Sequence, residues 1–238
     1  MRSDSQSHSH SHSDSLHIHE KIRHKIVRNE IPPGERITID ALARELGVSH
    51  TPIREALQRL EGEHLVSREP GRGYATTPLL TERQLQHMFE VRMLIEPWAC
   101  RVVAVDRAWN PGRSLLALID AFEQHHDNFC SRIDLAAHDT EFHSTIHSAT
   151  GNDFLVRTYN SLHAQAHLFR LYSHDVQSQS TLTEHRNIAT AIAACDGRSA
   201  HDAMHLHLQK SLERYMPALQ AHSTHDFRTP LPAHITTI

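Results

Sequence analysis

The chain has 238 residues, and 39% of them are hydrophobic, so it can bury one large core or two modest ones. Only 5% are aromatic and 8 are glycine, a composition that favours helices over a β-rich fold. The formal net charge is −4, and residues 15–78 carry 10 Lys/Arg against 9 Asp/Glu, which excludes nucleic-acid binding by bulk positive charge alone.

The three cysteines, Cys100, Cys130 and Cys195, lie far apart and form no Cys-x-x-Cys pair. This pattern indicates a reducing compartment rather than a disulfide framework or a thiolate zinc site. No apolar run approaches the ~20 residues of a membrane helix, and no signal-peptide pattern opens the chain. We therefore expect a cytoplasmic protein with no membrane partner.

Residues 1–14 alternate serine with histidine and contain nothing apolar to bury, so they are predicted to be a disordered tail. A loose tail that gathers metal ions is the alternative. A helix is predicted from about Leu16 to Asn29, because four apolar residues recur there on one face. These residues are Ile18, Ile22, Ile26 and Val27.

Residues 15–78 are predicted to form a winged helix-turn-helix domain. A short helix over 40–46 is followed by Gly47, where a left-handed turn is expected, and Ser49 is the predicted cap of the next helix. Apolar residues at helical spacing give that second helix one buried stripe: Ile53, Ala56, Leu57 and Leu60. Strands are predicted over 65–68 and 74–77, with a tight turn over 70–73.

The second helix of such a domain places its first turn against the edges of DNA bases. Arg54 can donate two hydrogen bonds to a guanine, and hydroxyl groups beside it suit phosphate oxygens. The residues predicted to bind DNA are Arg36, Ser49, His50, Thr51, Arg54, Arg72 and Gly73. Because imidazole is weakly charged near neutrality, His50 predicts an affinity for DNA that rises as pH falls.

From residue 79 the pattern is helical almost throughout, and residues 79–221 are predicted to form an all-α bundle. Six helices are expected, at about 81–107, 113–129, 132–149, 153–173, 180–196 and 199–216, and the last ends at Pro217. Residues 222–238 are expected to be a flexible tail. The predicted fold class is thus mainly α, a winged helix-turn-helix followed by a six-helix bundle.

Four residues of the bundle have the chemistry of metal ligands. Asp139 and His143 are four residues apart and share one face of a helix, while His185 and His207 lie in two later helices. Three imidazoles and a carboxylate suit zinc, with nickel, cobalt and manganese as alternatives. Spacing alone does not exclude other histidines of the bundle as metal ligands. These are His138, His147, His201 and His205.

The N-terminal segment resembles the winged helix of the GntR family of bacterial transcription regulators. The resemblance covers about residues 16–78 and rests on five short motifs. They are Pro33-Gly34-Glu35-Arg36, Leu42-Ala43, Leu46-Gly47-Val48-Ser49, Thr51-Pro52-Ile53-Arg54-Glu55-Ala56-Leu57 and Arg72-Gly73-Tyr74. Many relatives have an arginine where His50 and Asp40 stand here.

Residues 83–217 resemble the FCD effector domain of the FadR subfamily. The motifs are Asp139-x-x-Phe142-His143, Gly151-Asn152, Glu184-His185-x-x-Ile188 and Met204-x-x-His207. The resemblance implies that Asp139, His143, His185 and His207 bind a divalent metal in a pocket that accepts a small carboxylate metabolite. It also implies that Arg92 faces the carboxylate, although a surface salt bridge with Glu96 is an equal alternative from the sequence.

These observations predict a regulator that binds double-stranded operator DNA as a homodimer and represses transcription until a small organic acid binds. Three alternatives remain at this point. The metal ion itself could be the effector, the metal could serve a hydrolase, or a fatty acyl-CoA could be the signal with no metal present. The DNA-reading segment argues against an enzyme.

Overall fold

The computed structural model describes residues 5–126, 129–171 and 176–226. Predictions for residues 1–4 and for the tail from residue 227 therefore lie outside the described residues. The chain divides into two compact units. The first comprises residues 1–79, 126–144 and 156–178, and the second comprises residues 80–125, 145–155 and 179–238.

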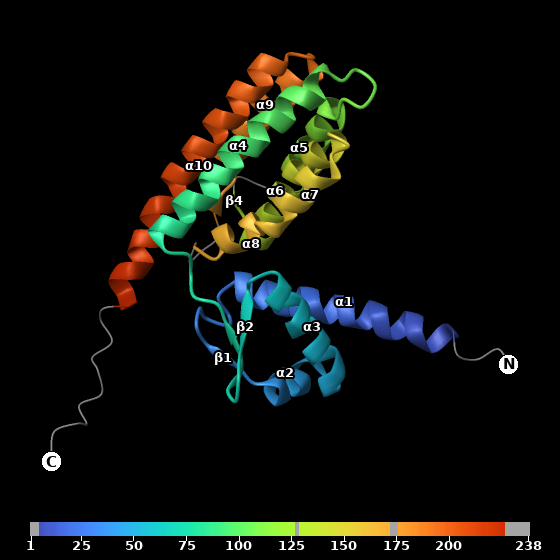
Figure 1. Ribbon diagram of the computed structural model, residues 1–238, viewed down its shortest axis with the longest axis vertical. Helices are drawn as coiled ribbons and strands as arrows, with labels where there is room; N and C mark the ends of the chain where they lie inside the picture. Colours follow the sequence, from blue (N-terminus) through green and yellow to red (C-terminus); the bar gives the residue numbers. More distant parts are fainter. Residues whose placement is uncertain (1–4, 127–128, 172–175, 227–238) are drawn as a thin grey trace. The chain divides into compact units, whose positions relative to one another are not determined.

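The N-terminal part of the first unit is a winged helix (Figure 1). Its elements are α1 Ser5–Val27, β1 Arg36–Ile37, α2 Ile39–Leu46, α3 His50–Gly62, β2 Val66–Glu69 and β3 Gly73–Thr76. The strands form an antiparallel sheet in the order β1-β3-β2, with Arg68 opposite Tyr74. The sequence predicts the hairpin, whereas the two-residue strand β1 is too short to show an alternating pattern.

Helix α1 begins at Ser5, inside the segment that was expected to be a disordered tail, and not at Leu16. No glycine or proline occurs before Pro32, and serine and histidine have only a modest helix penalty, so nothing in this stretch ends the helix. The four residues predicted to face the core are all buried: Ile18, Ile22, Ile26 and Val27.

The turn between α2 and α3 has the predicted conformation. Gly47 caps α2 with a left-handed φ of 68°, and its backbone N–H donates to the carbonyl of Ala43. Ser49 occupies the N-cap position of α3, although its side chain accepts no capping hydrogen bond. The predicted stripe of α3 lies in the core, since Ile53, Ala56, Leu57 and Leu60 are all fully buried.

The rest of the first unit contains β4 Phe129–Cys130 paired with β5 Val176–Gln177, and helix α8 Ala164–Phe169. Ala166 of α8 packs into the core of the winged helix. The helix predicted over 153–173 is in fact two, α7 Asp153–Ser161 and α8, because His163 adopts a left-handed φ of 43°. Neither glycine nor proline marks this break in the sequence.

The second unit is built from α4 Glu82–Val105, α5 Gly112–His125, α9 Gln179–Ala193 and α10 Gly197–Asp226 (Figure 1). Helix α6 Arg132–Ala149 is shared by the two units. Thr81 and Gln84 form a capping box at the start of α4. Gly112 lets α5 approach α9 closely, since a Cβ there would lie 2.4 Å from the backbone nitrogen of Ala193.

Helix α10 continues past Pro217, where it was predicted to end. A proline inside a helix removes one backbone hydrogen bond and usually breaks the helix. Here Tyr215 and Leu219 are both buried on either side of the proline, and their packing offsets that loss. None of the described helices is long and apolar enough to cross a membrane.

Candidate functional site

The residues predicted to contact DNA are all exposed on the winged helix. Four of them stand at the start of α3, Arg36 lies on β1, and Arg72 and Gly73 lie at the tip of the β2–β3 hairpin. The buried stripe of α3 fixes the opposite face of that helix in the core, so its first turns present Thr51 and Arg54 to solvent. This is the placement that a recognition helix requires.

A hollow joins the recognition helix to the hairpin. Its lining includes Thr51, Arg54 and Gln58 from α3 and Arg68 and Tyr74 from the hairpin. The guanidinium of Arg68 lies 5.9 Å from the centre of the Tyr74 ring. Gln58 and Arg68 are not among the residues predicted from the sequence, although Gln58 stands one helical turn after Arg54 and could have been found by that spacing.

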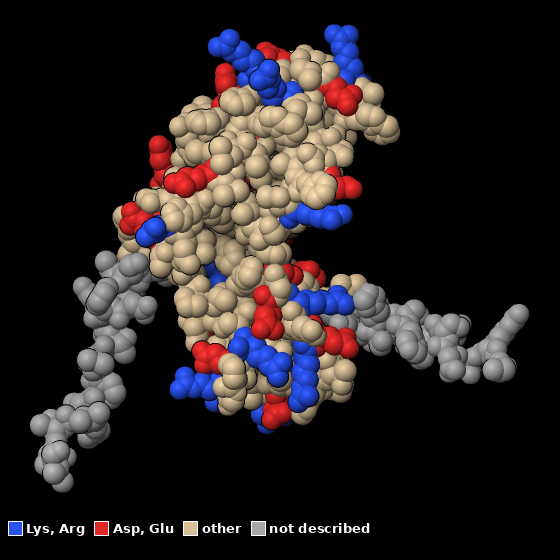
Figure 2. Space-filling view, viewed as in Figure 1, with Lys and Arg blue, Asp and Glu red and all other residues tan. Residues whose placement is uncertain are grey.

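Two of the residues predicted to contact DNA form ion pairs with acidic neighbours. His50 Nε2 lies 3.0 Å from Asp40 Oδ1, and Arg72 pairs with Glu69 at 3.6 Å. Figure 2 shows basic and acidic side chains interspersed over this domain. Exposed pairs of this kind contribute little stability, so phosphate groups can replace the carboxylates at small cost. Arg54 forms no ion pair with any described residue of the chain, so its guanidinium needs no such exchange.

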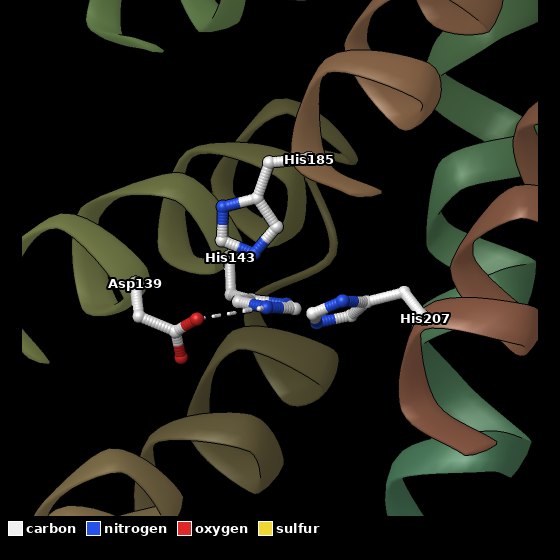
Figure 3. A group of neighbouring side chains, drawn as sticks. All are labelled: Asp139, His143, His185 and His207. Atoms are coloured by element: carbon white, nitrogen blue, oxygen red, sulfur yellow. Dashed lines mark ion pairs between the residues drawn. The ribbon is translucent and has the colours of Figure 1, made fainter. Parts of the chain in front are cut away.

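Asp139, His143, His185 and His207 come together in a buried group (Figure 3). Their ligand atoms all lie within 4.8 Å of one another, and Asp139 Oδ1 is 3.8 Å from His143 Nε2. Asp139 and His143 come from adjacent turns of α6, His185 from α9 and His207 from α10. The competing histidines His138 and His147 are also buried but lie outside this group.

A carboxylate orients one imidazole of the group. His207 Nδ1 lies 2.8 Å from Glu184 Oε2, and because an ionised carboxylate only accepts, Nδ1 must donate and Nε2 is left as the ligand atom. Arg214 donates to both oxygens of Glu184, at 2.7 and 2.8 Å. Burial raises the pKa of Glu184, but the hydrogen bonds from His207 and Arg214 outweigh it and lower the pKa to about 2.

Glu184 therefore stays ionised at neutral pH and holds the tautomer of His207. Metal-binding histidines in proteins commonly have such a carboxylate behind them. This role was not predicted from the sequence, because the two residues are 23 apart and only the packing of α9 against α10 joins them.

The donor set fits a divalent transition metal. Three imidazoles and one carboxylate, buried and converging, are ligands that zinc takes in proteins. They do not suit calcium or magnesium, which take oxygen ligands.

Arg92 lies on α4 and is 1% exposed. Its Nε donates to Glu96 Oε1 at 2.5 Å, and its guanidinium lies 5.1 Å from the centre of the Phe89 ring. The i,i+4 pair with Glu96 thus exists, but it is buried and not the surface salt bridge that was the alternative. A buried arginine paired in this way is fixed in position and desolvated.

A winged helix with an exposed recognition helix, followed by a helical domain, defines the class of DNA-binding regulators. Comparison with known families agrees. Residues 14–76 match bacterial regulatory proteins of the gntR family, and residues 87–210 match the FCD domain. The chain belongs to the GntR family of transcriptional regulators and carries a C-terminal FCD domain.

Relatives of this kind cover most of the chain. It is 24% identical over 208 residues to the HTH-type transcriptional regulator YdhC of Bacillus subtilis, spanning 86% of this chain and 92% of YdhC. It is 28% identical over 154 residues to the gluconate operon transcriptional repressor of B. subtilis, spanning 64% of this chain and 62% of the repressor.

A crystal structure of a GntR transcriptional regulator from Rhodococcus sp. RHA1 has the same fold, with a TM-score of 0.67 at 21% identity. The match covers 87% of this chain and 99% of the Rhodococcus chain. The resemblance inferred from the sequence is therefore confirmed for both domains. Since the family consists of transcriptional regulators, the protein is a regulator and not a hydrolase.

Proposed function

We propose that the protein is a cytoplasmic repressor that binds operator DNA as a homodimer and responds to a small carboxylate metabolite bound at a metal in its helical domain. The observation that carries this proposal is the buried group of Asp139, His143, His185 and His207, whose ligand atoms lie within 4.8 Å of one another. Nothing else in the described part of the chain gathers metal ligands in this way.

Zinc is the metal that this donor set fits best, with nickel, cobalt and manganese as alternatives. When bound, the ion supplies a Lewis-acidic centre to which a carboxylate can coordinate. Glu184 and Arg214 hold His207 in the tautomer that presents Nε2.

Arg92 is the proposed partner of the ligand carboxylate. Its Nε donates to Glu96, and the planar guanidinium has the geometry that suits the two oxygens of a carboxylate. Because Glu96 holds the side chain in place, little conformational entropy is lost when the ligand binds.

On the DNA side, Ser49, Thr51 and the N-terminus of α3 suit phosphate oxygens, and Arg54 suits a guanine in the major groove. Two chains related by a twofold axis would read two half-sites about one helical turn apart. To lower operator affinity by about ten- to hundredfold, the ligand must favour one arrangement of the protein by roughly 1.4–2.8 kcal/mol.

Selection of genomic fragments by the purified protein tests the DNA-binding part of this proposal. An Arg54→Ala variant should bind the selected operator about tenfold or more weakly and lose preference at one base pair. Arg113→Ala, which removes an exposed arginine of α5, should bind like the wild type. Equal affinity of the two variants would rule out the proposed role of Arg54.

A thermal-shift screen of small carboxylates on the zinc-loaded protein tests the effector part, since a true ligand raises the melting temperature by mass action. Arg92→Lys keeps a cation beside the buried Glu96 but loses the planar arrangement, so the shift should shrink while the fold survives. If operator binding responds to zinc alone and to no acid, the metal ion itself is the effector. Four protein ligands around zinc would then complete a tetrahedral site with no position for an acid.

A further inference from the structure

Helix α4 carries a row of large apolar side chains on its solvent face. Leu94 is 76% exposed, Trp98 46% and Val105 62%. The spacings of 4 and 7 residues place all three on one face of the helix. Single exposed hydrophobic residues are ordinary, but a continuous row along one helix is typical of a surface that another protein covers.

Two charged residues extend the same row. Glu90 stands one turn before Leu94, and Arg101 stands between Trp98 and Val105. The four residues from Leu94 to Val105 in this row, at intervals of 4, 3 and 4, have the heptad spacing of a helix that pairs with another helix. Both are exposed, and within the described part of the chain neither forms an ion pair. The row of Glu90, Leu94, Trp98, Arg101 and Val105 is called the α4 stripe below.

A hollow beside the C-terminal end of the α4 stripe is lined by two arginines. It is lined by Arg101 and Val105 of α4 and by Gly197, Arg198 and His201 of α10. Arg198 and His201 already lie 4.0 and 2.9 Å from the carboxylate oxygens of Asp202, whereas Arg101 forms no ion pair within the described part of the chain. The guanidinium of Arg101 therefore suits an acidic side chain brought by a partner. Position 197 favours glycine, because the Cβ of any other residue would lie 2.9 Å from Val105 Cγ1.

We propose that two copies of this chain pair through their α4 stripes, antiparallel and about a twofold axis that passes near Glu96. In this register Leu94 packs against Trp98 of the partner subunit, and Trp98 packs against Leu94 of the partner subunit. The same register places Glu90 within one residue, or about 1.5 Å, of facing Arg101 of the partner subunit. The carboxylate of Glu90 then lies beside the guanidinium of Arg101 of the partner subunit.

The stripe is therefore complementary to itself in both polarity and charge, as a twofold interface must be. A parallel pairing would instead place Glu90 beside Glu90 and Arg101 beside Arg101, which costs free energy. This inference rests on the proposed function, since it names the surface through which that homodimer forms and brings two recognition helices to one operator.

Charge exchange tests the pairing directly in the full-length protein, with sedimentation velocity over a range of concentrations. Glu90→Arg and Arg101→Glu should each raise the dimer dissociation constant at least about tenfold, because each places like charges opposite one another. The double variant Glu90→Arg/Arg101→Glu should return to within a few fold of the wild type. Arg113→Glu, an equal charge reversal on α5, should leave the constant unchanged.

Trp98→Asp should weaken the dimer at least about a hundredfold, because it places a charge in the apolar centre of the interface. Phe154→Asp is the matched control, since Phe154 is 80% exposed on α7, outside the α4 stripe. A monomeric wild-type protein, single reversals without effect, or a double variant as weak as the singles would each overturn the pairing. Zinc content measured on the same samples reports on the proposed effector site independently.

Discussion

At the scale of single residues, Glu184 shows how a side chain outside the predicted ligand set shapes the candidate metal site. It accepts from His207 and from both terminal nitrogens of Arg214, and these hydrogen bonds keep it ionised. A neutral amide in its place could not hold the imidazole as firmly. In the proposed metal site, the ligand strength of His207 would therefore depend on a residue outside the ligand set.

A Glu184→Gln substitution is expected to weaken zinc binding by about ten- to hundredfold, because it removes the charge that orients His207. Competition against a chromophoric chelator measures this change. Glu123→Gln serves as control, since it also removes a carboxylate that pairs with an arginine, but at an exposed site beside Arg186. Equal zinc affinity in both variants would contradict the role assigned to Glu184.

His19 provides a prediction on pH. Ion pairs with Glu20 at 3.4 Å and with Glu63 at 2.6 Å raise its pKa to about 9 against the opposing effect of burial. Because the folded pKa lies above the unfolded value near 6.5, the stabilisation is fully present below pH 6.5 and is lost as pH rises through 9. The loss should amount to at most about 3 kcal/mol.

Urea unfolding at pH 6 and at pH 9.5 measures this contribution. The difference between the two pH values should shrink in a His19→Gln variant, which cannot carry the charge. His17→Gln, two residues earlier on the exposed side of α1, should behave like the wild type. A pH dependence that is the same in all three proteins would show that another group is responsible.

At the scale of secondary-structure elements, local chemistry determined most of what could be predicted. The turn at Gly47 and the stripe of α3 both follow from rules that act over a few residues, and the structure confirms both. Two features were not predicted, because tertiary packing overrides the local preference at each: the helix break at His163 and the continuation of α10 through Pro217. The early start of α1 at Ser5 has a local cause instead, since no glycine or proline before Pro32 ends the helix.

Gly47 offers the clearest test of such a local rule. Its φ of 68° lies in the region that penalises a side chain, so Gly47→Ala should destabilise the winged helix by about 1–2 kcal/mol. Gly62→Ala, near the end of α3, should be neutral or slightly stabilising, because this glycine has no positive φ and no atom within 4 Å of its Cβ position. Denaturant midpoints that move equally would refute the distinction.

At the scale of the whole molecule, the sequence pattern could not say which distant residues meet. Four candidate ligands came from a resemblance, whereas spacing alone left other histidines in competition. No sequence pattern marks Arg170 as a buried residue. Its guanidinium nevertheless donates to the side chain of Thr77, 93 residues away, at 3.1 Å. Such pairings depend on how helices pack, which periodicity within one helix does not encode.

The candidate metal ligands come from helices α6, α9 and α10, so a metal that binds them should stabilise the folded chain. Zinc that binds only the folded state, at a free concentration of 100 times its dissociation constant, contributes about 2.7 kcal/mol. For a chain of this length that corresponds to a rise of about 5–10 °C in melting temperature. Scanning calorimetry with chelator and then with buffered zinc measures the rise.

The 24 histidines of the chain can also bind zinc in the unfolded state, which would reduce the rise. A matched pair of variants removes this complication. His143→Ala and His205→Ala each delete one histidine, so zinc binding to the unfolded chain is the same in both, but only His143 belongs to the buried group. The zinc-dependent rise should disappear in His143→Ala and persist in His205→Ala. An equal rise in the two variants would mean that zinc binds elsewhere on the protein.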